Sequence, residues 1–161
     1  MAISTLNKKY GWTPDLPDHR DHTFALQIAP EKLPVSIDLR KGCPVPFNQQ
    51  QLGSCTANAI AGALEFDQIK QRLPIFMPSR LFIYYNERLM EGTVSSDSGA
   101  MIRDGIKSVA SQGAPPETIW PYNINKFATK PSSAAYSAAA QHKAISYSRV
   151  NQDLGSMQLA G

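Results

Sequence analysis

The chain has 161 residues, of which 42% are hydrophobic and 18% are charged, and its net charge is +3. These values are typical of one globular domain with a core, and they exclude a disordered or fibrous chain. The basic residues are scattered and do not alternate with aromatic residues, so we expect no nucleic-acid partner. No stretch is long and apolar enough for a membrane span, and the first ten residues lack the apolar region of a signal peptide, so we expect no membrane partner.

Residues 1–34 differ in composition from the domain that we expect over residues 35–161. The stretch from Tyr10 to His22 is rich in Pro and Asp and has neither helical nor strand periodicity, which predicts an extended segment. His19 and His22 lie three residues apart, but the nearby prolines disfavour a helix and no further ligands follow at suitable spacing. We therefore expect no metal site and no cofactor.

The chain contains two cysteines, Cys43 and Cys55. Small secreted domains are usually stabilised by several disulfides, and two cysteines do not make such a framework. A reducing compartment, and hence a cytoplasmic location, is the simpler expectation.

Cys55 stands between a Gly-Ser turn and an apolar helix. From Ala57 onward, apolar residues recur at three- and four-residue spacing, which predicts a helix from about Cys55 to Arg72, where Leu73-Pro74 ends it. The unpaired amides and the dipole at a helix N-terminus favour a thiolate, so this is one way to make a cysteine nucleophilic. The alternative is structural, because free cysteines are among the most buried residues and mostly act as small apolar groups.

The pattern Gln49-x5-Cys55, with Gly53-Ser54 before the cysteine and a helix after it, resembles the papain-like cysteine peptidases of the peptidase C1 family. Residues 37–40, Ile-Asp-Leu-Arg, resemble the segment that opens the mature enzyme in that family. Residues 55–58, Cys-Thr-Ala-Asn, resemble a bacterial and viral branch of it. The order and spacing of these pieces favour a catalytic Cys55.

This resemblance implies an α+β fold, mainly its helical half, with a central helix that starts at the nucleophile. It implies a hydrolase in which the Cys55 thiolate attacks a peptide carbonyl while the Gln49 amide and the Cys55 N–H hold the oxyanion. Gly53 and Ser54 would line the groove for a peptide or protein substrate. In this branch a short N-terminal extension can lie over that groove, so residues 1–34 are a candidate propeptide-like segment.

An alternative for the N-terminal segment stays open. It is a strap that only packs on the domain through Trp12, Leu16 and Phe24, without a role at the groove.

Further helices are predicted from Arg80, capped by Ser79, to about Met90, from Ala100 to about Gln112, over residues 131–141, and over residues 151–160. Residues 142–150 alternate well enough to predict a strand. By resemblance, Ser98 and Gly99 pair with an extended substrate as an added strand pairs with a sheet edge. The alternative for Ser98 is an ordinary N-cap serine.

The family's catalytic histidine and asparagine follow the cysteine by about 130 to 150 residues. This sequence stops before that distance, and His142 has neighbours unlike the family's motif, so we do not assign it to catalysis. We expect the histidine half on polypeptide beyond Gly161 or on a second chain. The alternatives are an inactive half domain that binds or regulates peptides, and a structural protein. A half domain would expose apolar surface that needs a covering partner.

Overall fold

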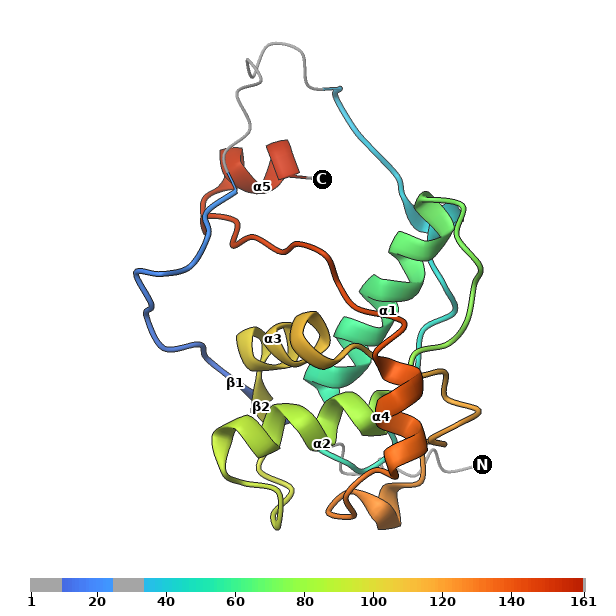
Figure 1. Ribbon diagram of the computed structural model, residues 1–161. Coiled ribbons are helices and arrows are strands. Elements are labelled where there is room, and N and C mark those ends of the chain that lie inside the picture. Colours follow the sequence, from blue (N-terminus) through green and yellow to red (C-terminus); the bar gives the residue numbers. More distant parts are fainter. Residues whose placement is uncertain (1–9, 25–33, 161) are drawn as a thin grey trace, which may run out of the picture.

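The computed structural model describes residues 10–24 and 34–160, and three helices form its body (Figure 1). These are α1 (Cys55–Lys70), α2 (Arg80–Glu91) and α3 (Ile102–Gln112), and each packs on the other two. A short α4 (Ser133–Ala139) covers the outer side of α2, and α5 (Leu154–Ala160) lies apart from the body.

The described residues also include short 3-10 helices at Arg40–Gly42 and Ile124–Lys126. Among them the regular strands are β1 (Trp12–Thr13) and β2 (Ala100–Met101), which form a two-stranded parallel sheet. The chain therefore has the predicted α+β class with its helical half well formed. No helix in this described part is long and apolar enough to cross a lipid bilayer.

Serine and glycine set the ends of α2 and α3, as predicted, whereas α1 ends at Lys70, two residues before the predicted Arg72, which is left-handed with φ 57°. The Ser79 hydroxyl accepts a hydrogen bond from the Phe82 N–H at the start of α2, and Gly92 ends that helix with φ 72°. Gly113, with φ 85°, ends α3. The predicted start of α3 at Ala100 was two residues early, because Ala100 and Met101 pair with β1 instead.

The predicted strand over residues 142–150 is wrong. The described structure has only an isolated bridge there, between Thr23 and Arg149, and the Ile145 side chain is fully exposed. The backbone groups of a strand need hydrogen-bond partners on a neighbouring strand, and residues 142–150 have such a partner only at the bridge to Thr23.

The core lies where α1, α2 and α3 meet. It consists of small and branched apolar side chains together with one tyrosine, namely Leu52, Ala57, Ile60, Ala61, Leu81, Ile83, Tyr84, Val109 and Ala114. Residues 80 to 88 of α2 are all buried, so this helix has no solvent face over most of its length. The ionisable side chains of Glu87 and Arg88 are therefore fully buried.

Glu87 places a carboxyl group inside the three-helix body. Its Oε1 accepts a hydrogen bond from Thr56 Oγ1 at 2.7 Å. Its Oε2 has no hydrogen-bond partner among the described residues and faces Gly105 of α3, where an added Cβ would lie 2.6 Å away. Burial, with a smaller contribution from Glu91, raises the pKa of Glu87 to about 8, so this carboxyl is neutral at pH 7.

We expect the stability of the protein to fall as pH rises from about 5 to about 8. The unfolded chain releases the Glu87 proton near its ordinary pKa of 4.5, whereas the folded chain holds it to about 8. The free energy of unfolding then falls by about 1.4 kcal/mol per pH unit between these values. Urea unfolding at several pH values should show that Glu87→Gln flattens this slope and that Asp67→Asn, an exposed change on α1, does not. An unchanged slope in Glu87→Gln would contradict the assignment.

Candidate active site

Cys55 is the first residue of α1, and its thiol is free and half-buried. Ser54 and Thr56 on either side are buried, so the start of the helix is fixed while the sulfur stays accessible. The first amides of α1 lie at this end without intrahelical partners. The sulfur is therefore not enclosed in the apolar core, and its position suits a nucleophile.

The Gln49 side chain lies in the loop that leads to Cys55. Its Nε2 donates to the backbone oxygen of Leu52 at 3.0 Å, and a carboxamide nitrogen carries two N–H donors. The next residue, Gln50, adopts a left-handed conformation with φ 57°, and its N–H donates to Asn48 Oδ1. The loop is thus a tight turn, and the Gln49 amide that it bears lies six residues before the cysteine in the sequence.

Asp97 joins this loop to the one that carries Ser98 and Gly99. The Gly53 N–H donates to the Asp97 carboxylate, at 3.0 Å to Oδ1, and the Tyr84 hydroxyl donates to the same oxygen. The Gly99 N–H donates in turn to the Tyr84 hydroxyl at 3.2 Å. Burial raises the pKa of Tyr84, which keeps this hydroxyl protonated. The backbones around Gly53 and Gly99 are therefore held at a fixed separation.

Gly11 of the N-terminal segment lies against both of these backbones. A Cβ on Gly11 would lie 2.0 Å from the Gly53 oxygen, and one on Gly99 would lie 1.8 Å from the Gly11 oxygen. The Ala100 N–H donates to the Gly11 oxygen at 2.8 Å, and β1 then continues parallel to β2, with Trp12 opposite Ala100. An extended segment thus lies against Gly53 and Gly99 through its backbone.

Basic residues of α3 hold the acidic N-terminal segment. The Arg103 N–H donates to Asp15 Oδ1, and its guanidinium forms an ion pair with Asp21. Lys107 lies 3.9 Å from Asp18. Hydrogen bonds from Arg149 and Arg103 hold the pKa of Asp21 below its usual value.

The alternative interpretation of the N-terminal segment was a strap held by apolar packing of Trp12, Leu16 and Phe24. The structure shows little such packing. Trp12 and Leu16 are mostly exposed, and only Phe24 is half-buried. The strap is therefore held by backbone pairing and ion pairs rather than by burial of Trp12 and Leu16.

The two predicted groove serines have side chains bonded inside the protein. Ser98 Oγ lies 2.9 Å from Thr93 Oγ1 and 3.0 Å from the Gly99 oxygen, and the N-cap of α3 is Met101, so the N-cap alternative for Ser98 is wrong. Ser54 is fully buried, and its hydroxyl lies 2.6 Å from the Tyr122 hydroxyl. The contribution of both residues to a peptide groove stays a prediction.

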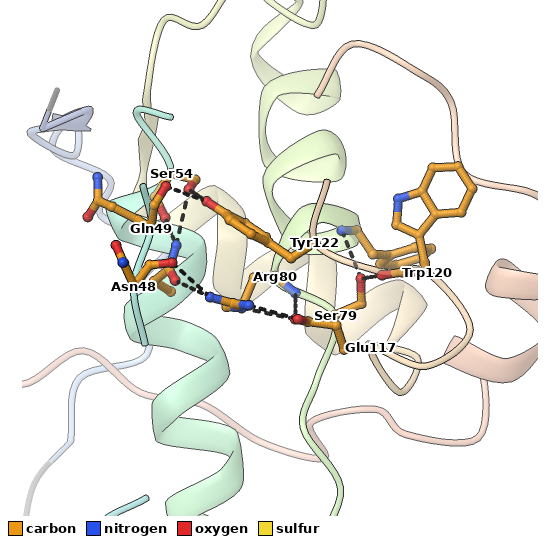
Figure 2. A network of polar contacts seen from close by, with 10 residues as sticks. Asn48, Gln49, Ser54, Ser79, Arg80, Glu117, Trp120 and Tyr122 are labelled. Carbon is orange, nitrogen blue, oxygen red and sulfur yellow. Dashed lines mark hydrogen bonds and ion pairs between the residues drawn. The ribbon is translucent and has the colours of Figure 1, made fainter. Parts of the chain in front are cut away.

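A polar network behind the cysteine loop was not predicted from the sequence (Figure 2). Arg80 and Glu117 form a buried ion pair with two hydrogen bonds, at 2.9 and 2.7 Å. The Arg80 guanidinium also lies over the Tyr122 ring, 4.0 Å from its centroid. These residues are far apart in sequence. The one local sign of the network was Arg80, a charged residue directly after the helix cap Ser79.

The described histidines lie in other surroundings. The His142 ring packs on Phe76 with centroids 4.3 Å apart, and His19 and His22 are exposed. Within residues 10–24 and 34–160 no histidine is hydrogen-bonded to Cys55, and no group of three or more His, Cys, Asp or Glu residues is arranged to hold a metal ion.

Known proteins resemble the chain in sequence and in fold. A protein of Acanthamoeba polyphaga mimivirus named as peptidase C1-like is 42% identical over 94% of this chain and 54% of its own length. Xylellain, a cysteine protease from Xylella fastidiosa, is 42% identical with a TM-score of 0.83, over 95% of this chain and 62% of that one.

A digestive procathepsin L 3 from Tenebrio molitor, 16% identical with a TM-score of 0.66 over 96% of this chain and 47% of that one, shares the fold. No protein-family model matches the chain. The chain spans about half the length of the curated relative it matches.

Proposed function

The chain is a relative of the papain-like cysteine proteases with the helical half of their fold, and we propose that it supplies the nucleophile of a cysteine endopeptidase. The observation that carries this proposal is the accessible, free thiol of Cys55 at the first position of a helix. In this role the Cys55 thiolate attacks a peptide carbonyl carbon, and the Gln49 amide and the Cys55 N–H stabilise the oxyanion. The substrate is a peptide or protein.

The reaction also needs a general acid. The C–N bond of the substrate breaks as the leaving amine takes a proton from a histidine, and water then hydrolyses the thioester to restore the thiol. We propose that this histidine and its asparagine partner come from polypeptide beyond residue 161, or from a second chain. General acid–base assistance is typically worth about a hundred- to ten-thousand-fold in rate, so residues 1–161 alone should turn over little substrate.

The N-terminal segment is proposed to inhibit the same groove. Gly11 lies against Gly53 and Gly99, where an extended substrate backbone would pair, and Trp12 and Thr13 pair with Ala100 and Met101. The ion pairs of Arg103 and Lys107 keep the segment in place. Since the pKa of Asp21 is lowered, these ion pairs persist below the usual Asp titration range, and mild acid alone should not release the segment.

The test compares two cysteines in one molecule. Iodoacetamide is added near pH 6 to the protein as its gene encodes it, and the labelling rates of Cys55 and the exposed Cys43 are measured by peptide mass spectrometry. We expect Cys55 to react at least about tenfold faster than Cys43, because a catalytic nucleophile is activated and an ordinary surface thiol is not. Cleavage of labelled casein should disappear in Cys55→Ala and persist in Cys43→Ala. Equal labelling together with cleavage that survives Cys55→Ala would reject the proposal.

A second candidate is a peptide-binding module without catalysis. The observation in its favour is that an extended segment pairs through its backbone with Ala100 and Met101, while no described histidine is bonded to Cys55. This module would show slow labelling of Cys55, and its affinity for peptides would be the same in Cys55→Ala.

A further inference from the structure

We propose that Tyr122 is a positioning residue for the cysteine chemistry, because its hydroxyl ties the backbone of Gln49 to Ser54, the residue before the nucleophile. The inference rests on the proposed function. Figure 2 shows the Tyr122 side chain directed from its own loop toward both residues. The role is distinct from contact with substrate, since Tyr122 acts through the loop that carries Gln49.

The hydroxyl of Tyr122 lies at the centre of a directed chain of hydrogen bonds. It donates to the Gln49 backbone oxygen at 2.9 Å. With its single proton used there, it accepts from Ser54 Oγ at 2.6 Å. Asn58 Nδ2, one turn into α1, donates to the Ser54 backbone oxygen at 2.8 Å and to Ser54 Oγ at 3.1 Å. Both ends of the loop between Gln49 and Cys55 are thus held by one hydroxyl and one amide.

Arg80 fixes the other side of the same peptide. Its NH1 donates to the Asn48 backbone oxygen and to Asn58 Oδ1, each at 3.2 Å. The successive carbonyls of Asn48 and Gln49 are therefore held by Arg80 and Tyr122. The ion pair with Glu117 and the stacking over the Tyr122 ring orient the guanidinium for this task.

This arrangement matters for the transition state more than for substrate binding. An oxyanion donor is effective only when it already lies within hydrogen-bond distance of the forming negative charge. Displacing the Gln49 backbone relative to Cys55 would misplace that donor while leaving Gly53 and Gly99 unchanged. Loss of the Tyr122 hydroxyl should therefore lower kcat and leave KM nearly constant.

The experiment is a double-mutant cycle on peptide hydrolysis by the protein as its gene encodes it. We expect Tyr122→Phe to lower kcat about tenfold and Gln49→Ala to lower it about a hundredfold. In the Gln49→Ala background, Tyr122→Phe should change kcat less than about twofold, because the group through which it acts is gone. Iodoacetamide labelling of Cys55 involves no oxyanion and should be unchanged by Tyr122→Phe.

Tyr136→Phe is the matched control, since it removes another tyrosine hydroxyl, one that donates to Asn86 Oδ1 at 2.9 Å in α2, and it should leave kcat unchanged. Ser54→Ala breaks the same link from its other side and should also lower kcat, which keeps the proposal testable if Tyr122→Phe folds poorly. Additive effects of Tyr122→Phe and Gln49→Ala would overturn the positioning role while leaving the peptidase intact. A wild-type protein without Cys55-dependent cleavage would instead reject the proposed function, and this inference with it.

Discussion

Gly11→Ala is expected to open the groove at Cys55 to peptide-length reagents. The added Cβ would lie 2.0 Å from the Gly53 oxygen and 2.7 Å from the Gly99 Cα, and both are backbone atoms that cannot swing aside. The Asp97 link between the two backbones prevents the groove from widening to accept it. Overpacking of this kind typically costs about 1–3 kcal/mol. The ratio of bound to released segment should fall by a factor of about five to about a hundred.

The measurement is the rate at which a short peptidyl epoxide labels Cys55, compared with the rate for iodoacetamide. The peptidyl reagent needs the groove, whereas the small reagent needs only the half-buried sulfur. Gly11→Ala should raise the first rate about five- to a hundredfold and leave the second nearly unchanged. Trp12→Ala, a change at the next residue, whose side chain is mostly exposed, serves as the control. If Gly11→Ala leaves the peptidyl rate at the wild-type value, the segment does not compete for the groove.

The helices and the position of Cys55 at a helix start were predictable because their signals are local. Ser79 and Gly92 mark helix ends by backbone chemistry that depends on a few neighbouring residues. Cys55 lies at a helix start for the same reason. The resemblance inferred from the residues around Gln49 and Cys55 agrees with two similar proteins, each 42% identical, of which one is named as peptidase C1-like and the other as a cysteine protease.

The features that the sequence could not predict depend on contacts between distant residues. The strand expected at 142–150 had the right alternation but no neighbouring strand beyond the bridge at Thr23. The link from Gly53 to Asp97 spans 44 residues, and the pair of Arg80 and Glu117 spans 37. Periodicity describes one face of one element, so it carries no information on which polar groups meet across the fold.

The burial of charge in α2 is the strongest case. Amphipathic spacing predicts an inner and an outer face, yet Glu87 and Arg88 are both fully buried and Leu89 is half exposed. The helix is covered on one side by α1 and α3 and on the other by α4 and the loops around Val94 and Phe127. A helix enclosed on all sides needs hydrogen-bond partners inside the protein for its polar side chains. Sequence patterns do not reveal which residues these partners are.

Arg88→Met is expected to destabilise the protein by about 3 kcal/mol, because it removes a buried guanidinium that donates to three backbone oxygens. The guanidinium NH1 donates to the oxygens of Val94 and Ser96 at 2.8 and 2.9 Å, and NH2 donates to that of Phe127. Methionine fills much of the space but leaves these oxygens without their donors. Urea unfolding measures the loss, with Arg40→Met as the control, since Arg40 is exposed and pairs with Asp38 at the surface.

The same substitution should also loosen the link between Asp97 and Gly53, and this local effect separates the role of Arg88 from general stability. Arg88 holds the loop from residue 93 to residue 98, and that loop positions Asp97 against Gly53. Hydrogen exchange should therefore become faster at the Gly53 and Gly99 amides in Arg88→Met, while amides in the middle of α1 change only as the global stability requires. Arg88→Lys keeps the charge but not the planar fork of donors, and it should fall between the two proteins in both measurements. Exchange at Gly53 that follows global unfolding alone would show that the loop holds its place without Arg88.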